Sequence, residues 1–218
     1  MLVIAHRGYH AKFSENTRAA FEAAIAIGVD GIEIDVRICR DGSIVIVHDR
    51  VVSGKAVAKL THSELEHEIG HKVPTLDETL ECFPRIMWNI EIKTTEALEL
   101  VIGILEKYQT NRQILVTSFH HDVVEICASI LKVDCGLLVA HRPQKLNSLL
   151  ESCRDNSRIN HIVWDYNILD VVLLKQATSS GYRNFVYGLA TKAECDYCKG
   201  IDVDGVITDN PDLLLDNR

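Results

Sequence analysis

The 218-residue sequence predicts an α/β fold of the (β/α)8 TIM-barrel class, formed as a single domain over residues 1–218, with a short excursion after the second strand. Three observations support this prediction. Short runs of Val, Ile and Leu, typical of strands buried on both faces, alternate with amphipathic stretches of helical length. Eight such units fit into the chain. The sequence has no Gly-rich dinucleotide loop, which disfavours the alternative of an open doubly wound sheet.

The apolar runs place the eight strands at Leu2–His6, Gly31–Val36, Met87–Ile92, Gln113–Thr117, Gly136–Val139, His161–Asp165, Asn184–Leu189 and Gly205–Thr208. The amphipathic stretches between them predict helices at Thr17–Ile27, Glu96–Tyr108, Asp122–Leu131, Leu146–Cys153, Asp170–Ser179 and Ala193–Lys199. Thr75 and Glu78 have the spacing of a capping box and predict a further helix start.

One part of the chain breaks this alternation. Residues 50–72 are polar and contain three histidines, so we expect a small inserted loop with a short helix above the barrel, and we hypothesise that it acts as a lid. Before it, two β-like runs at residues 32–38 and 44–48 are joined by a tight turn at Asp41-Gly42, which is a strong hairpin signal. A turn this short makes the second run antiparallel, so it is not a barrel strand.

The hairpin predicts a cluster of ionisable side chains. With the turn centred between Asp41 and Gly42, Asp35 pairs directly with His48, at a distance of roughly 5 Å. Glu33 lies two residues from Asp35 and therefore shares its face of the strand. The hairpin is thus expected to bring a histidine to two carboxylates.

Polar residues also end other predicted strands. His6 and Arg7 end the first strand, and Glu91 and Lys93 end the third. Polar residues at the carboxyl ends of barrel strands converge on the active-site face. We therefore expect these side chains to meet around one point: His6, Glu33, Asp35, His48, Glu91 and Lys93.

Three carboxylates at one point require an explanation. Two negative charges ~5 Å apart repel by about 3 kcal/mol at an effective dielectric constant of ~20, so the cluster needs raised pKa values or a bound cation. An all-oxygen site suits Mg²⁺ or Ca²⁺ better than zinc. Two histidines beside it can act as acid and base, and Lys93 and Arg7 supply positive charge for an anionic substrate. The pattern indicates metal-assisted displacement at a phosphate.

Each residue alone also has a structural interpretation. Arg7 can pair with Glu15, Lys93 can pair with Glu91, and a single histidine at a strand end is more often a hydrogen-bonded structural residue. These interpretations lose weight because six such residues stand at matching strand ends. A glycosidase that uses two acidic residues on a barrel is a further alternative, but it leaves both histidines and Lys93 without a role.

The motifs resemble those of the glycerophosphodiester phosphodiesterases, in the order of that family and over almost the whole chain. The segments that carry the resemblance are HRG at 6–8, SENT at 14–17, GIEIDVRICRDG at 31–42, VHD at 47–49, VPTLDETL at 73–80 and IEIK at 90–93, with weaker matches at 117–119 and 202–214. The resemblance implies a PLC-like phosphodiesterase barrel that releases sn-glycerol 3-phosphate and a free alcohol such as choline or ethanolamine.

The resemblance also implies a role for each site residue. A divalent cation, Mg²⁺ or Ca²⁺, is expected on Glu33, Asp35 and Glu91. General acid and base roles are expected for His6 and His48, and phosphate contacts for Arg7 and Lys93. Candidate substrate-pocket residues are Phe119 and Tyr187.

The chain departs from the family pattern in three places. Ser14 stands where the family usually has Pro, the segment after VHD is shorter, and Tyr187-Gly-Leu-Ala190 stands where the family often has Trp-Thr-Val-Asn. The second difference leaves the head-group preference open. The third removes a Trp and an Asn, so a polar contact near the glycerol end is either absent or replaced in part by Tyr187.

Bulk properties restrict the partners. The balance of 23 basic and 31 acidic residues gives a net charge of -8, which disfavours nucleic acid and anionic membranes as general partners.

Neither a signal peptide nor a membrane-spanning segment is expected. The first residues, MLVIAHRG, have the pattern of a strand and not of a signal peptide, and no apolar run approaches the ~20 residues that span a bilayer. The seven cysteines are odd in number and scattered, which argues against a disulfide framework. We expect a cytoplasmic enzyme, without a stable membrane anchor, that acts on a small glycerophosphodiester. The oligomeric state is not predicted.

Two functional alternatives remain within the barrel. A lysophospholipase D-type lipid phosphodiesterase needs an apolar approach to the site, and residues 50–72 contain few large apolar side chains. A non-catalytic barrel that only binds glycerophosphodiesters is the second alternative, disfavoured by the intact His6 and His48.

Overall fold

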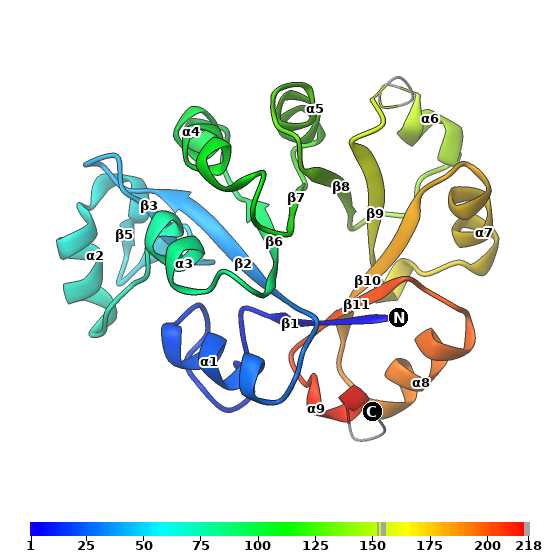
Figure 1. Ribbon diagram of the computed structural model, residues 1–218, viewed down its shortest axis with the longest axis horizontal. Coiled ribbons are helices and arrows are strands. Elements are labelled where there is room, and N and C mark those ends of the chain that lie inside the picture. The colour runs from blue at the N-terminus through cyan, green and yellow to red at the C-terminus, as the bar shows by residue number, and fades with distance from the viewer. Residues whose placement is uncertain (152, 154–155, 216–218) are drawn as a thin grey trace.

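The structure is a computed structural model that describes residues 1–151, 153 and 156–215 (Figure 1). Eight parallel strands form a closed barrel, because β1 pairs with β2 on one side and with β11 on the other. These strands are β1 (Leu2–His6), β2 (Gly31–Ile38), β6 (Met87–Ile92), β7 (Ile114–Ser118), β8 (Asp134–Val139), β9 (Ile159–Asp165), β10 (Arg183–Leu189) and β11 (Gly205–Thr208). The predicted (β/α)8 barrel is confirmed.

Helices surround the ring of strands (Figure 1). They are α1 (Arg18–Ala26), α3 (Leu76–Cys82), α4 (Leu98–Tyr108), α5 (His121–Ile130), α6 (Leu146–Leu150), α7 (Val171–Ser179), α8 (Lys192–Gly200) and α9 (Asp212–Leu215), with 3-10 turns η2 (Thr95–Ala97) and η3 (Tyr166–Ile168). Thr75 and Glu78 form the predicted capping box, and Thr191 and Glu194 form another at the start of α8. The helix predicted to run to Cys153 ends at Leu150, and residue 152 lies outside the described part of the chain.

An excursion follows β2 and lies at the left of the barrel in Figure 1. It comprises the antiparallel strand β3 (Ile44–Ile46), the small hairpin β4 (Val51–Val52) and β5 (Lys55–Ala56), the 3-10 turn η1 (Val57–Lys59) and helix α2 (His62–Ile69). It has a small core of its own, made of Cys39, Val45, Val57, Leu60, Leu65 and Val73.

The pairing between β2 and β3 differs from the prediction by one residue. Val36 pairs with Ile46, and the backbone N–H of Val47, not that of His48, donates to the carbonyl oxygen of Asp35 at 2.9 Å. The cause is the turn, which closes between Cys39 and Ser43 as a three-residue loop with Gly42 at φ 85°. A left-handed glycine at the last loop position is typical of three-residue hairpins. The predicted direct pairing of Asp35 with His48 is therefore wrong.

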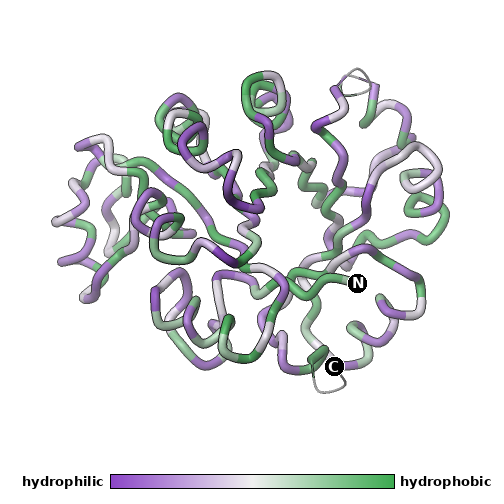
Figure 2. The backbone as a smooth tube through the Cα atoms, viewed as in Figure 1, coloured by the Kyte–Doolittle hydropathy of each residue, from purple (hydrophilic) through white to green (hydrophobic). Residues whose placement is uncertain are grey.

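Apolar side chains fill both the barrel and the layer between strands and helices. Figure 2 shows hydrophobic residues along the barrel strands, while hydrophobic and hydrophilic residues alternate along the outer helices. The inside of the barrel is packed by Ile4, Leu115, Leu138, Val163, Phe185 and Ile207. His161 is fully buried there, with its ring edge-on to Phe185 at 5.0 Å between centroids.

The seven cysteines lie within the described residues and are all free thiols; Cys82 is exposed and the other six are buried. Within the ranges that the structure describes, no helix is both long and apolar enough to cross a bilayer.

Candidate active site

Three carboxylates form a buried cluster at the carboxyl ends of β2 and β6. Glu33 and Asp35 share one face of β2, and the parallel register places Glu91 of β6 opposite Asp35. Carboxylate oxygens of the three residues lie within 4.8 Å of one another. All three are at most 8% exposed. The sequence-predicted acids are therefore brought together by the barrel, as the rule of convergent strand ends requires.

Glu33 carries the least compensated charge of the cluster. Burial raises its pKa well above the usual value, and the negative charges of Asp35 and Glu91 raise it further. Its Oε1 atom is buried and has no hydrogen-bond partner among the described residues. The pKa of Glu91 is also raised, by burial first. A buried acceptor oxygen without a partner is costly, so a positively charged ligand would stabilise this cluster.

The environment of Asp35 lowers its pKa, whereas that of Glu33 raises its pKa. Burial alone would raise its pKa, but the positive charges of Lys93 and Arg7 lower it below its usual value. Lys93 Nζ lies 3.0 Å from Asp35 Oδ1, and Arg7 Nε lies 3.2 Å from Oδ2. The Asn16 amide also donates to Oδ2 at 3.0 Å. Asp35 is therefore held as a carboxylate in the interior of the protein.

The loop after β1 owes its course to three residues in the left-handed region. Arg7 and Asn16 both have φ 55°, and Gly8 has φ 79°. At Gly8 a Cβ atom would lie 2.8 Å from the backbone of Ala20, so only glycine lets the loop approach α1. This path allows Arg7 to contact Glu15 at 2.9 Å through its guanidinium and Glu33 at 3.1 Å through its backbone N–H.

Lys93 is held between two of the carboxylates. Its Nζ atom lies 2.7 Å from Glu91 Oε1, in addition to its contact with Asp35. The side chain is 12% exposed, and although burial lowers its pKa, the two carboxylates raise it overall. Lys93 is therefore a fixed positive charge at the edge of the cluster.

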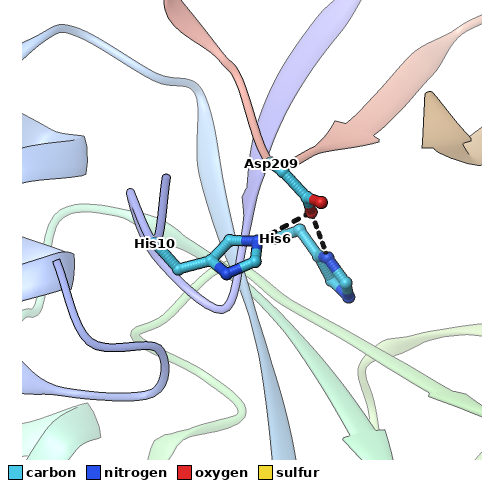
Figure 3. A group of neighbouring side chains, drawn as sticks. All are labelled: His6, His10 and Asp209. Carbon is cyan, nitrogen blue, oxygen red and sulfur yellow. Dashed lines mark hydrogen bonds and ion pairs between the residues drawn. The ribbon is translucent and has the colours of Figure 1, made fainter. Parts of the chain in front are cut away.

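His6 contacts both the cluster and Asp209, a carboxylate that the sequence did not predict; Figure 3 shows the contact with Asp209. Its Nε2 atom is 3.8 Å from Glu33 Oε2, and its Nδ1 atom is 2.6 Å from Asp209 Oδ1. His10 Nε2 lies 2.8 Å from the same Asp209 oxygen. Asp209 directly follows β11. It could therefore have been predicted from the sequence, because polar residues at the carboxyl ends of barrel strands converge on one face. His10 stands in a loop, where no strand-end signal exists.

His48 lies beyond the β2–β3 pairing and approaches the cluster from a different element. Its carbonyl oxygen accepts a hydrogen bond from Arg37 Nε at 2.8 Å, and its Nδ1 lies 2.9 Å from Asp49 Oδ1. A protonated His48 is close enough to lower the pKa of Asp35 and of Glu91. His6, by contrast, contacts Glu33. The two histidines thus act on different members of the cluster.

Phe119 and Tyr187, the candidate substrate-pocket residues, are neighbours. Their rings meet edge to face with centroids 6.2 Å apart, and Phe119 is 44% exposed. Burial raises the pKa of Tyr187, and its hydrogen-bonded neighbour Asp165 and the more distant Glu91 raise it further. An aromatic pair therefore lies within electrostatic range of the acidic cluster.

The donor set of the cluster fits a hard divalent cation. Glu33, Asp35 and Glu91 offer oxygen atoms only, which suits Mg²⁺ and Ca²⁺. The unpartnered Glu33 Oε1 and the raised pKa of Glu33 are the signs of missing positive charge that such an ion would supply.

Comparison with known proteins gives the same assignment from independent evidence. The family model of the Glycerophosphoryl diester phosphodiesterase family matches residues 6–213. A glycerophosphodiester phosphodiesterase from Caldanaerobacter subterraneus subsp. tengcongensis is 30% identical, over 98% of this chain and 96% of that protein.

Solved structures of phosphodiesterases also have the fold of this chain. The crystal structure of a glycerophosphodiester phosphodiesterase from Thermotoga maritima has a TM-score of 0.86 and 30% identity, over 100% of this chain and 98% of that one. A phosphodiesterase from Oleispira antarctica, in complex with the product sn-glycerol-3-phosphate, has a TM-score of 0.88 and 22% identity, over 100% and 96%. The second likeness concerns the fold alone. The chain therefore belongs to the glycerophosphoryl diester phosphodiesterase family and is a phosphoric diester hydrolase.

Proposed function

We propose that the protein hydrolyses glycerophosphodiesters to sn-glycerol 3-phosphate and a free alcohol, with a divalent cation held by Glu33, Asp35 and Glu91. The observation that carries this proposal is the buried three-carboxylate cluster with an unpartnered oxygen, next to His6 at the barrel mouth. Family membership supports the reaction class, and the product bound to the Oleispira antarctica relative is consistent with the same product here.

The cation, Mg²⁺ or Ca²⁺, would supply positive charge for the phosphoryl oxygens and help orient the attacking group. The protein contributes a preorganised site for it: burial, and then repulsion by Asp35 and Glu91, raise the pKa of Glu33, and a cation would offset both effects. Asp35 is already ionised through Arg7 and Lys93, so it is ready to accept a ligand without losing a proton.

His6 and His48 are proposed to move the protons of the reaction. The Nδ1–H of His6 donates to Asp209, which leaves Nε2 facing the cluster with a lone pair to accept a proton. His48 lies within electrostatic range of Asp35 and Glu91, whereas His6 contacts Glu33, and we propose that one histidine accepts a proton while the other donates one. Each role is typically worth 10²–10⁴ in rate, or roughly 3–5 kcal/mol.

Arg7 and Lys93 are proposed to bind the substrate phosphate. Both already contact carboxylates, and each has further N–H donors beyond those contacts. Their fixed positions favour a phosphate that arrives next to the cluster, because a charge-assisted hydrogen bond gains most when the donor is preorganised.

Small water-soluble diesters are the proposed substrates. In residues 50–72 the only large apolar side chain that is strongly exposed is Val51, which offers little surface for an acyl chain. The aromatic pair of Phe119 and Tyr187 provides a surface for the glycerol or the head group. A lysophospholipase D reaction would need a longer apolar path.

The experiment is release of sn-glycerol 3-phosphate from glycerophosphocholine and glycerophosphoethanolamine, with lysophosphatidylcholine measured in parallel. The protein is treated with EDTA and then supplied with Mg²⁺ or Ca²⁺. Release that requires the metal and is lost in His6→Ala and His48→Ala is the expected result. His71→Ala, which changes an exposed histidine of the excursion, is the matched control and should retain activity.

Other outcomes would contradict the proposal in specific ways. Full turnover after EDTA treatment would remove the cation from the mechanism. Faster release of choline from lysophosphatidylcholine, with lysophosphatidic acid as the other product, than from glycerophosphocholine would establish the lipid phosphodiesterase. Tight binding of glycerophosphocholine without turnover under any metal would establish the binding-only barrel.

A further inference from the structure

We propose that His6, His10 and Asp209 form a second metal site, separate from the carboxylate cluster, that takes a transition metal such as Zn²⁺ and switches the enzyme off when occupied. The inhibitory effect rests on the proposed proton-transfer role of His6. The binding itself does not depend on that role.

The geometry places three donor atoms around one point (Figure 3). His6 Nδ1 and His10 Nε2 lie 2.6 and 2.8 Å from Asp209 Oδ1, and all three atoms lie within 4.8 Å of one another. Donors of a tetrahedral zinc site, with bonds of about 2.0–2.1 Å, lie about 3.3 Å apart. Small rotations of partly exposed side chains separate the atoms to that distance.

The contacts among His6, His10 and Asp209 leave one ring nitrogen without a hydrogen bond. His10 Nε2 is buried and, within the described part of the chain, makes no hydrogen bond, although it lies close to Asp209. A ring nitrogen that approaches a carboxylate without hydrogen-bond geometry is a donor without a partner. The three side chains are 27%, 22% and 48% exposed, so an ion from solution can reach them.

Carboxylates also face the other nitrogen of each ring. His6 Nε2 lies 3.8 Å from Glu33 Oε2, and His10 Nδ1 lies 3.9 Å from Glu15 Oε2. Histidines that bind metals usually present their second ring nitrogen to a carboxylate, a carbonyl or water, which fixes the ring and strengthens the ligand. Each histidine of the proposed site therefore has a carboxylate just beyond hydrogen-bond distance of its second ring nitrogen, where a small movement of the side chain would complete the contact.

Donor chemistry separates this site from the carboxylate cluster. Two imidazole nitrogens and one carboxylate oxygen, with an open fourth position for water, form a set that zinc favours. The cluster of Glu33, Asp35 and Glu91 offers oxygen only and favours Mg²⁺ or Ca²⁺. The barrel mouth thus offers two neighbouring sites with different metal preferences.

Occupancy would remove His6 from proton transfer. A neutral imidazole whose Nδ1 binds a metal carries its hydrogen on Nε2, the nitrogen that faces the cluster. It then has no free lone pair to accept a proton. Zinc is therefore expected to inhibit without displacing the cation on the carboxylates.

The test is zinc binding by titration calorimetry at saturating Mg²⁺, which occupies the carboxylate cluster, followed by diester hydrolysis at the same Mg²⁺ concentration with increasing Zn²⁺. Wild type should bind one Zn²⁺ and lose activity as it binds. His10→Ala should bind Zn²⁺ at least 10-fold more weakly and keep its activity at zinc concentrations that inhibit wild type. His67→Ala, a change at an exposed histidine of α2, should behave as wild type in both measurements.

Glu91→Gln distinguishes the two sites. It alters the carboxylate cluster and leaves the three proposed zinc ligands unchanged, so zinc affinity should remain within a few-fold of wild type. Zinc affinity that is lost in Glu91→Gln and unchanged in His10→Ala would overturn the second site. If the wild-type protein shows no diester hydrolysis, the proposed function fails, while the calorimetric comparison still decides the metal site.

Discussion

At the scale of single residues, Glu33 is a buried acid that lies close to two further carboxylates, Asp35 and Glu91. Replacing it with glutamine keeps its shape and removes its charge. We expect Glu33→Gln to lose at least 10³-fold in kcat/KM, because a cation ligand is removed. In EDTA the same variant should melt at a temperature equal to or above that of wild type, because burial of the carboxyl group, and then repulsion by Asp35 and Glu91, raise the pKa of Glu33, and glutamine carries no charge to bury or repel.

The measurement is a pair of assays, glycerol-phosphate release with Mg²⁺ and thermal unfolding with chelator. Glu99→Gln makes the same chemical change at an exposed position of α4 and should alter neither. A Glu33→Gln protein that is clearly less stable than wild type in EDTA would show that this carboxylate serves the fold, contrary to our interpretation.

Asp209 is the residue that orients His6 in the proposed mechanism. Asp209→Asn keeps the size of the side chain but replaces a charged acceptor with a neutral amide, so the His6 ring loses the charge that fixes its tautomer. We expect kcat to fall by about 10² with little change in KM. Steady-state kinetics on glycerophosphocholine check this, and a change confined to KM would instead make Asp209 a substrate-binding residue.

At the scale of elements, the β2–β3 hairpin depends on a single backbone conformation. Gly42 closes the three-residue loop at φ 85°, which an L side chain adopts only with strain. We expect Gly42→Ala to lower the free energy of unfolding by about 1–2 kcal/mol. Urea unfolding followed by circular dichroism measures the change.

Gly103, in helix α4, is a glycine whose replacement should stabilise the protein. A Cβ atom there meets nothing within 4 Å, and helix interiors favour alanine over glycine. Gly103→Ala should therefore raise the free energy of unfolding by about 0.5–1 kcal/mol. Equal effects of the two substitutions would mean that loop conformation does not contribute to the stability of the hairpin.

The elements also show what the sequence could predict. Buried parallel strands need apolar side chains on both faces, so the eight strands were visible as runs of Val, Ile and Leu, and the meeting of Glu33, Asp35 and Glu91 followed from their strand-end positions. The hairpin register was wrong because Arg-Asp-Gly fits loops of either two or three residues. The contact of His10 with Asp209 depends on the path of a loop and has no periodic signal.

At the scale of the whole molecule, acid should destabilise the barrel through His161. Burial lowers its pKa from 6.5 to about 4. The unfolded chain takes up a proton near pH 6.5, and the folded protein does so only near pH 4. Between these values the unfolded state binds more protons, so the free energy of unfolding falls as the pH falls, by about 3 kcal/mol in total from this residue.

His161→Met isolates that effect, because it fills a similar volume without titrating. We expect the difference in unfolding free energy between pH 7 and pH 4 to be smaller in the variant by roughly this amount, measured by urea unfolding at each pH. An identical pH dependence in both proteins would exclude His161 as the origin of acid sensitivity.

The closure of the barrel between β1 and β11 has a consequence for synthesis on the ribosome. The first strand has no partner on one edge until the last strand has been made, and His6 meets Asp209 across 203 positions of sequence. Every nascent chain that lacks β11 exposes an unpaired parallel edge, which is prone to association. Enzyme activity would therefore appear only after β11 has left the exit tunnel. In a series of ribosome-bound chains arrested at increasing lengths, the onset of activity would mark the length at which the barrel closes.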